Sequence, residues 1–316
     1  MIKLIVAFMI IVPLGLDLYL PIPADNPLSP ERVALGRRLF FDSILSRDRT
    51  VACASCHDPR LAFTDARPLA IGAHGRLGAR NTPTLINRAY GRSEFLDGRV
   101  TTLEEQAVQP IANVRELDFS VAGAVDRLNQ SREYRARFDS VFGTAASELV
   151  LAQALAAYVR TILDGDSPYD RYLAGDSAAL SPDARRGLRI FRGKAGCATC
   201  HFGPTMSDER FHNTGVAWRN AAWTDSGRFN VTLIASDLGG FKTPTLREIA
   251  RTAPYMHDGS MPTLAAVIDY YDRGGNRAPS QDADLRPLGL TSAEKTMLQA
   301  FLGALSGRTR DGINRQ

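Results

Sequence analysis

Apolar positions recur at helical spacing along most of this 316-residue chain, and helix-start signals stand before them. Ser29-Pro30-Glu31 places a capping serine, a first-turn proline and an acid at the positive end of a helix dipole. This triplet predicts a helix running through Leu39-Phe40. Longer amphipathic patterns predict helices over about 121–138 and 148–163.

Helix signals in the second half follow the same order as in the first. Ser181-Pro182-Asp183 predicts a helix start, and Thr291 with Glu294 predicts a capping box for a closing helix. The segment 164–168, Asp-Gly-Asp-Ser-Pro, is typical of a domain boundary. No run of alternating apolar and polar residues indicates strands. The fold is therefore predicted to be mostly α with long coil segments, in two domains at 21–165 and 166–316.

The first 20 residues are predicted to be a signal peptide or an uncleaved N-terminal anchor. Lys3 gives a positive start, and the run from Leu4 to Leu16 is apolar except for Pro13 and a glycine. Asp17 ends this run, which is short for a membrane span. We therefore expect residues 1–20 to lie outside the fold and the protein to be periplasmic.

Composition adds two limits. Hydrophobic residues make up 44% of the chain and charged residues 23%, which is typical of a soluble globular protein with a full core. The net charge of +4 is small and is not gathered in a dense basic tract. Nucleic acid is therefore not expected as a partner.

Two short segments carry the strongest chemical signal. Both read Cys-x-x-Cys-His, which is the attachment pattern of c-type haem, and together they contain all the cysteines of the chain. Two thiols at this spacing can form thioether bonds to one porphyrin, and the histidine supplies the proximal nitrogen to iron. The predicted haem-binding residues are Cys53, Cys56 and His57, and Cys197, Cys200 and His201.

Two other interpretations of these motifs are weaker. A zinc site would need two further ligands near each motif. A thioredoxin-like redox pair has no requirement for a histidine after the second cysteine. The sequence therefore predicts two covalently bound haem c groups, one in each cytochrome c-like domain.

Four longer segments resemble the bacterial di-haem cytochrome c peroxidases and their relative MauG. In chain order they are "DNPLSPERVALGRRLFFDSILSRDRTVACASCHDP", "RNTPTLINRAY", "DGRVTTLEEQAVQPIANVRE" and "FKTPTLREIARTAPYMHDGSMPTLAAVIDYY". The resemblance implies that the first haem reacts with hydrogen peroxide and that the second relays electrons. It also implies that a small periplasmic cytochrome c or copper protein supplies those electrons, and that the protein can form a homodimer.

The resemblance assigns three pocket residues to the first haem: Gln106, Pro110 and Glu116. Cleavage of an O–O bond needs a group that moves a proton from the near oxygen to the leaving one. Glu116 is the candidate acid–base, and Gln106 is the candidate group that orients peroxide or water. Without the resemblance, Glu116 would be interpreted as a solvated surface acid.

Further ligands are also implied by the resemblance. His74, flanked by glycines, matches the histidine that binds the first haem in the resting oxidised peroxidases. A calcium ion between the haems would be held by Asn81, Thr252 and Pro254, through an amide oxygen and carbonyl oxygens that suit a hard cation.

The sixth ligand of the second haem departs from the peroxidase pattern. Peroxidases of the family place a methionine where this chain has Tyr271, and MauG places a tyrosine there. A phenolate favours ferric and higher oxidation states, whereas a thioether favours ferrous iron. Tyr270, Met256 or Met261 remain alternative ligands, with Tyr271 packing in the core.

Two positions differ from MauG. A tryptophan between the haems is replaced by Leu96, and a surface tryptophan before the second motif is replaced by Ala195. Neither replacement can be oxidised to a radical, so oxidation of a partner protein by the MauG route is disfavoured. The leading hypothesis is a periplasmic di-haem peroxidase. The alternatives are a MauG-like enzyme that oxidises a partner protein, and a non-enzymatic di-haem electron carrier.

Overall fold

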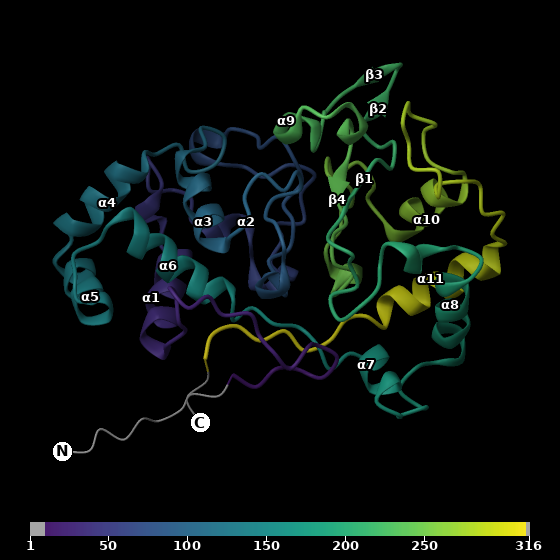
Figure 1. Ribbon diagram of the computed structural model, residues 1–316, viewed down its shortest axis with the longest axis horizontal. Helices are drawn as coiled ribbons and strands as arrows, with labels where there is room; N and C mark the ends of the chain where they lie inside the picture. The colour runs from purple at the N-terminus through teal and green to yellow at the C-terminus, as the bar shows by residue number, and fades with distance from the viewer. Residues whose placement is uncertain (1–9, 314–316) are drawn as a thin grey trace.

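The structure is a computed structural model that describes residues 10–313. Helices dominate it, and the strands are short (Figure 1). The helices are α1 (Pro30–Phe41), α2 (Cys53–Cys56), α3 (Leu103–Ala112), α4 (Val121–Gln130), α5 (Arg132–Phe142), α6 (Glu148–Val159), α7 (Pro168–Leu173), α8 (Pro182–Arg192), α9 (Phe229–Thr232), α10 (Leu264–Asp272) and α11 (Ser292–Gly303). Two antiparallel pairs join β1 (Phe211–His212) to β4 (Phe241–Lys242) and β2 (Trp218–Arg219) to β3 (Ala222–Trp223). The mostly α prediction is confirmed.

The predicted helix starts are formed by the residues that the sequence indicated. Ser29 accepts a hydrogen bond from the Arg32 amide at α1, and Ser181 accepts one from Ala184 at α8. The capping box predicted at Thr291 begins α11, and a further capping box begins α3 at Thr102. Each such cap stabilises its helix by about 1 kcal/mol.

The helix predicted over 121–138 is two helices in the structure. The amphipathic pattern over 121–138 is divided between α4 and α5, because the Ser131 side chain accepts a hydrogen bond from the Tyr134 amide and caps a new helix. Residues 129–133, Asn-Gln-Ser-Arg-Glu, are all polar and interrupt the apolar spacing, so the break had a local signal in the sequence.

Two separate hydrophobic cores divide the chain. Buried residues of the first core lie within 33–162, and those of the second lie within 169–305. In the first, α1 packs on α6; in the second, α8 packs on α11. Both crossings are close at a glycine: a Cβ on Gly36 would lie 1.8 Å from the Ala154 carbonyl oxygen, and one on Gly187 would lie 1.9 Å from that of Met297. The two halves therefore repeat one helix-crossing arrangement.

A Thr-Pro-Thr segment after each cysteine motif is also repeated. The Thr84 hydroxyl donates to the Ala62 carbonyl at 2.7 Å, and the Thr245 hydroxyl donates to the Thr205 carbonyl at 2.6 Å. Each segment leads into a 3₁₀ turn, η4 (Arg88–Tyr90) or η7 (Ile249–Arg251). The remaining 3₁₀ turns are η1 (Ser43–Leu45), η2 (Pro59–Leu61), η3 (Ala73–Gly75), η5 (Cys197–Thr199) and η6 (Ala235–Asp237).

The C-terminal tail returns from the second half to the first. The Tyr158 hydroxyl donates to Asp311 at 2.7 Å, and the Gly312 amide donates to the Thr161 hydroxyl at 2.9 Å. Ile313 packs against the first core. The last described residues of the chain therefore complete the half that was made first.

The N-terminal segment differs from expectation. We expected residues 1–20 to lie outside the fold; residues 1–9 lie outside the described part, but residues 10–20 pack along the junction of the two halves, where Leu16 and Leu20 are buried. None of the described helices combines the length and the apolar character needed to cross a bilayer.

Candidate functional site

One large cavity lies between the two halves. Its volume is about 1520 Å³, and its lining includes Cys56 and His57 of the first motif and Cys197, Cys200 and His201 of the second. Ligand pockets are usually about 300–1,000 Å³. A cavity this large, with one attachment motif on each side, has room for more than one prosthetic group.

Both motif histidines are held in the orientation that metal binding requires. His57 Nδ1 lies 3.0 Å from the Phe63 carbonyl oxygen, and His201 Nδ1 lies 3.0 Å from that of Met206. A carbonyl accepts only from a protonated Nδ1, so each ring keeps the lone pair of Nε2 for a metal. Burial lowers the pKa of both imidazoles below the usual value, which keeps them neutral. This donor set fits the proximal side of a haem iron.

The cysteines fit thioether attachment better than redox chemistry. All are present as free thiols rather than as disulfides. Burial raises the pKa of Cys53 and Cys56 to about 12 and that of Cys197 to about 11. Redox-active Cys-x-x-Cys pairs have a lowered pKa instead.

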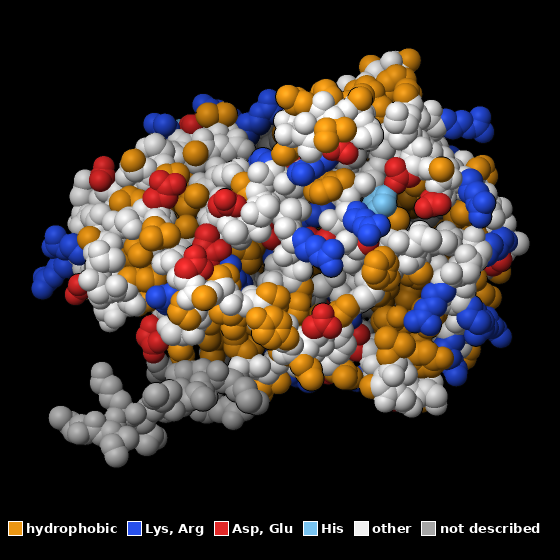
Figure 2. All heavy atoms as spheres, viewed as in Figure 1, with side chains coloured by type: hydrophobic (Ala, Val, Ile, Leu, Met, Phe, Trp, Pro, Cys, Tyr) orange, Lys and Arg blue, Asp and Glu red, His pale blue; other side chains and the backbone are white. Residues whose placement is uncertain are grey.

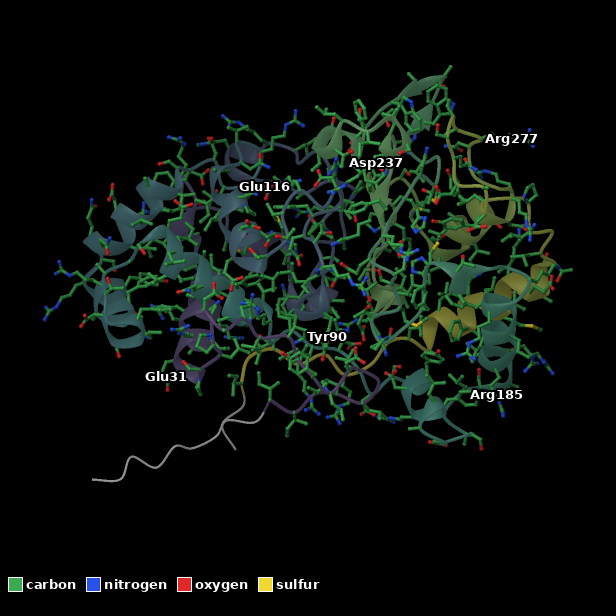
Figure 3. All side chains as sticks on the ribbon, viewed as in Figure 1. Glu31, Tyr90, Glu116, Arg185, Asp237 and Arg277 are labelled. Carbon is green, nitrogen blue, oxygen red and sulfur yellow. The ribbon has the colours of Figure 1, made fainter. Side chains whose placement is uncertain are left out.

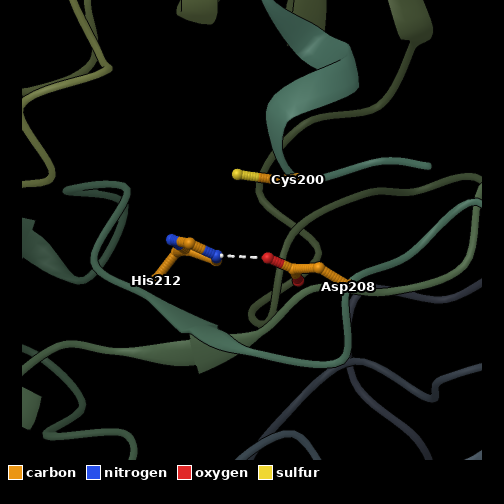
Figure 4. A group of neighbouring side chains, drawn as sticks. All are labelled: Cys200, Asp208 and His212. Atoms are coloured by element: carbon orange, nitrogen blue, oxygen red, sulfur yellow. Dashed lines mark hydrogen bonds and ion pairs between the residues drawn. The ribbon is translucent and has the colours of Figure 1, made fainter.

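Among the described residues, one group of side chains lies close enough together to hold a metal ion. It consists of Cys200, Asp208 and His212 (Figure 4). His212 Nδ1 lies 2.5 Å from Asp282, and its Nε2 lies 3.0 Å from Asp208. The hydrogen bond to Asp282 is the largest cause that raises the pKa of His212, to about 11. Both ring nitrogens face carboxylate oxygens, so neither is free to bind a metal ion in this arrangement.

One face of α3 supplies the cavity wall near the first motif. Leu103, Gln106 and Pro110 line the cavity and follow one another at helical spacing. Asn113 and Glu116, just beyond the helix, continue the same wall. The structure therefore brings the three sequence-predicted pocket residues together.

Glu116 is held in place by a neighbour that the sequence did not single out. Asn113 Nδ2 donates to Glu116 Oε1 at 2.6 Å. Burial raises the pKa of Glu116 above its usual value, against the lowering effects of Asn113 and of the Arg99 charge. Its charge in turn contributes to raising the pKa of Cys56 of the first motif. Figure 3 shows Glu116 in the upper part of the first half.

The corresponding face of α10 lines the cavity near the second motif. Leu264, Val267 and Tyr271 occupy the same helical spacing as their counterparts on α3. Burial raises the pKa of the Tyr271 phenol, and the cysteines of the second motif contribute to the shift. Tyr271 thus lies near that motif.

The alternatives to Tyr271 are placed differently. The Tyr270 hydroxyl donates to the Thr214 carbonyl at 2.8 Å, and Tyr270 is absent from the cavity wall. Met256 lines the cavity, whereas Met261 does not. Tyr271 and Met256 therefore remain as candidates, and ligation by Tyr271 stays a prediction.

His74 lies away from the cavity in this structure. It sits in a surface turn with 43% of its side chain exposed, and its ring nitrogens lie 3.5 Å from Asp48 and from Asp118. Ligation of the first iron would need this loop to move. That assignment stays a prediction.

The residues predicted to hold calcium all line the cavity: Asn81, Thr252 and Pro254. The Asn81 amide nitrogen donates to the Arg67 carbonyl at 2.7 Å, which fixes the side chain. A calcium ion at this position stays a prediction.

Comparisons with known proteins agree with this geometry. A family model described as di-haem cytochrome c peroxidase matches residues 30–178, and one described as RoxA-like, cytochrome c-like matches residues 240–275. The chain is 39% identical to the methylamine utilization protein MauG of Methylorubrum extorquens, over 90% of this chain and 81% of that one. It is 40% identical to the cytochrome-c peroxidase IdrP1 of Denitromonas iodatirespirans, over 93% of this chain and 86% of that one.

A solved structure shares the whole fold. The crystal structure of a MauG-like protein associated with microbial copper homeostasis matches with a TM-score of 0.83 and 33% identity, covering 94% of each chain.

The similarity to cytochrome c peroxidases makes this chain a peroxidase-type oxidoreductase. With an attachment motif on each side of one cavity, the chain belongs to the di-haem cytochrome c peroxidase family.

Proposed function

We propose that this protein reduces hydrogen peroxide to water in the periplasm, with two electrons from a small cytochrome c or copper protein. The observation that carries the proposal is the wall of the first half, where Glu116 and Gln106 reach the cavity beside the first motif. The overall reaction consumes one peroxide, two electrons and two protons and yields two waters. The export signal predicted near the N-terminus supports the location.

Two haem c groups fit the two motifs. The first would be held by Cys53, Cys56 and His57, and the second by Cys197, Cys200 and His201, in cytochrome c-like domains at 21–165 and 166–316. When bound, the haems supply an iron that can take up peroxide and a second iron that stores an electron. The remaining chemistry falls to side chains of the chain itself.

Glu116 is the proton-transfer group. A buried carboxyl with a raised pKa can accept the peroxide proton and return it to the leaving oxygen near neutral pH. The hydrogen bond from Asn113 fixes Oε1, which leaves Oε2 to face the substrate. Gln106, on the same wall, can hold peroxide or the released water through its amide.

The second half is the electron-relay side. Tyr271 would bind the second iron, and calcium at Asn81, Thr252 and Pro254 would sit between the haems. His74 would bind the first iron in the resting state and leave it on reduction of the second. A homodimer is the expected assembly.

The test follows reduced small cytochrome c as it is oxidised by peroxide. Turnover by the holoprotein, with one reduced donor molecule consumed per electron, is the expected result. Peroxide that disappears without oxidation of any donor, or that does not react at all, would contradict the proposal. Comparison of the fully oxidised and half-reduced protein shows whether reduction is needed first.

A second function is favoured by one observation. Tyr271 on the cavity wall matches the MauG pattern, and a MauG protein is 39% identical to this chain. Such an enzyme would use peroxide to oxidise a residue of a partner protein. Leu96 and Ala195 oppose this function, because neither side chain can carry a radical to the surface. A rapid reaction of peroxide with the fully oxidised protein would favour it.

A further inference from the structure

A segment near the N-terminus crosses the junction between the two halves. Residues 13–20, named the strap here, lie under both halves beside the returning C-terminal tail (Figure 1). Leu16 and Leu20 are 7% and 8% exposed, and both pack with Ala89 of the first half and Leu163 at the boundary. The strap is therefore part of a hydrophobic cluster and does not lie loosely on the surface.

The strap backbone is bonded to both halves. The Asp166 amide donates to the Leu14 carbonyl at 2.8 Å, and the Tyr90 hydroxyl donates to the Asp17 carbonyl at 2.8 Å. Tyr90 lies at the lower edge of the junction in Figure 3. These contacts join the strap to the domain boundary and to the first half.

The strap also completes the surroundings of a buried charge in the second half. Arg247 is 1% exposed, and its guanidinium donates to Asp170 at 2.5 Å and to the Gly15 carbonyl at 3.2 Å. A buried guanidinium N–H that loses its acceptor is strongly destabilising. Removal of the strap would therefore leave one buried N–H of the Arg247 guanidinium without its acceptor.

The packing around Gly15 leaves no room for a side chain at this position. Its φ is +90°, and a Cβ there would lie 2.0 Å from an Asp170 carboxylate oxygen. At the boundary, a Cβ on Gly165 would lie 2.5 Å from the Leu14 carbonyl oxygen. Such close approach on both sides is typical of a segment that belongs to the folded molecule.

We propose that the strap is retained in the exported protein, where it holds the two halves together across the shared cavity. Any processing of the export segment then takes place before Pro13. The predicted apolar run, Leu4 to Leu16, overlaps the strap, so it cannot be removed as one unit without opening the junction. The proposal is independent of the peroxidase activity.

The first test is the intact mass of the holoprotein purified after export. The expected polypeptide contains residues 13–20 and carries two haem c groups. A chain that begins after Leu20, or within the strap, would overturn the proposal whatever its activity.

The second test compares leucines that differ in burial. Leu16→Ser removes a buried side chain, whereas Leu14→Ser removes the same apolar group from the same run at a residue that is 46% exposed. Leu18→Ser, at 89% exposure, adds a control outside the run. We expect Leu16→Ser to lower the thermal midpoint of the holoprotein by roughly 5–15 °C and the controls to change it by at most about 2 °C.

The outcomes separate cleanly. The proposal is supported if the Leu14→Ser and Leu18→Ser proteins accumulate and the Leu16→Ser protein does not. It is also supported if Leu16→Ser accumulates with the lowered thermal midpoint. Equal midpoints for Leu16→Ser and Leu14→Ser would overturn it. If none of the variants accumulates, the intact mass of the unaltered protein decides alone.

Discussion

The two halves of this molecule place different side chains at matching positions of a repeated scaffold. On α3 the cavity face carries Gln106 and Pro110; on α10 the matching positions carry Val267 and Tyr271. The proline side chain has no atom that can bind a metal, whereas a phenol oxygen can. The prediction that Tyr271 binds the second iron therefore makes this one helix position the expected difference between the two sites.

The cavity walls formed by α3 and α10 also differ in charge. The first half adds Glu116, a buried carboxyl held by Asn113, directly after the helix. The matching wall of α10 is apolar apart from the phenol. Under the proposed function a proton-transfer group is useful only where peroxide can reach the iron, which agrees with the place of Glu116 on the wall of the first half.

The largest expected effect comes from making the first half resemble the second. Pro110→Tyr places a phenol at the position of Tyr271, and we expect it to occupy the open side of the first iron. Peroxide turnover should then fall to background while haem content stays at two per chain. Pro110→Ala, which adds no ligand, should keep turnover. Full activity of Pro110→Tyr would show that this position does not control access.

Removal of the proton-transfer group should have the next largest effect. Glu116→Gln keeps the size of the side chain but cannot accept a proton, so kcat for peroxide should fall by about 10²–10⁴-fold. Steady-state oxidation of a reduced donor measures it. Glu148→Gln, on the exposed start of α6, is the matched control. Equal rates for the two variants would remove Glu116 from the mechanism.

The predicted binding of Tyr271 to the second haem iron can be tested by spectroscopy. Tyr271→Phe removes the phenol oxygen, so the absorption and electron paramagnetic resonance signals of the second haem should change. Tyr270→Phe removes only the hydrogen bond to the Thr214 carbonyl and should cost about 1 kcal/mol of stability without a spectral change. An unaltered spectrum in Tyr271→Phe would instead point to Met256.

The smallest effect concerns the junction between the halves. Burial raises the pKa of Asp164 to about 8, and the Glu248 carboxylate adds to the shift. The folded state therefore keeps a proton that the unfolded state has lost, and stability should fall as pH rises from about 4 to 8. Asp164→Asn should remove this dependence and raise the thermal midpoint at pH 8 by a few degrees. Asp126→Asn, on exposed α4, should leave the pH profile unchanged.

Local signals in the sequence were sufficient for much of the fold and for the attachment residues. Caps such as Ser29 and Ser181 act on their own helix, and the cysteine motifs need no distant partner. The Phe63 and Met206 carbonyls that orient the histidines left no signal, because every residue has a carbonyl. Asn113 lies within a stretch quoted for the resemblance, and its spacing from Glu116 was the available clue.

Other features depended on tertiary packing that a pattern cannot reveal. An apolar run such as Leu4 to Leu16 is compatible with export and also with burial, and only the fit of Gly15 and Leu16 at the junction distinguishes them. His74 follows glycines that permit several loop positions, so its place beside Asp48 could not be derived. Acidic, basic and apolar side chains are interspersed on the face in Figure 2, so charge alone does not mark a docking site.

The returning tail has a consequence for the order of folding. Tyr158 and Thr161 obtain their partners, Asp311 and Gly312, only when the segment after α11 joins the first half. Until then the half translated first lacks its final contacts, even though its helices are complete. Chains truncated after α11 should therefore be more open to protease near α6, about 150 positions upstream of the missing contacts.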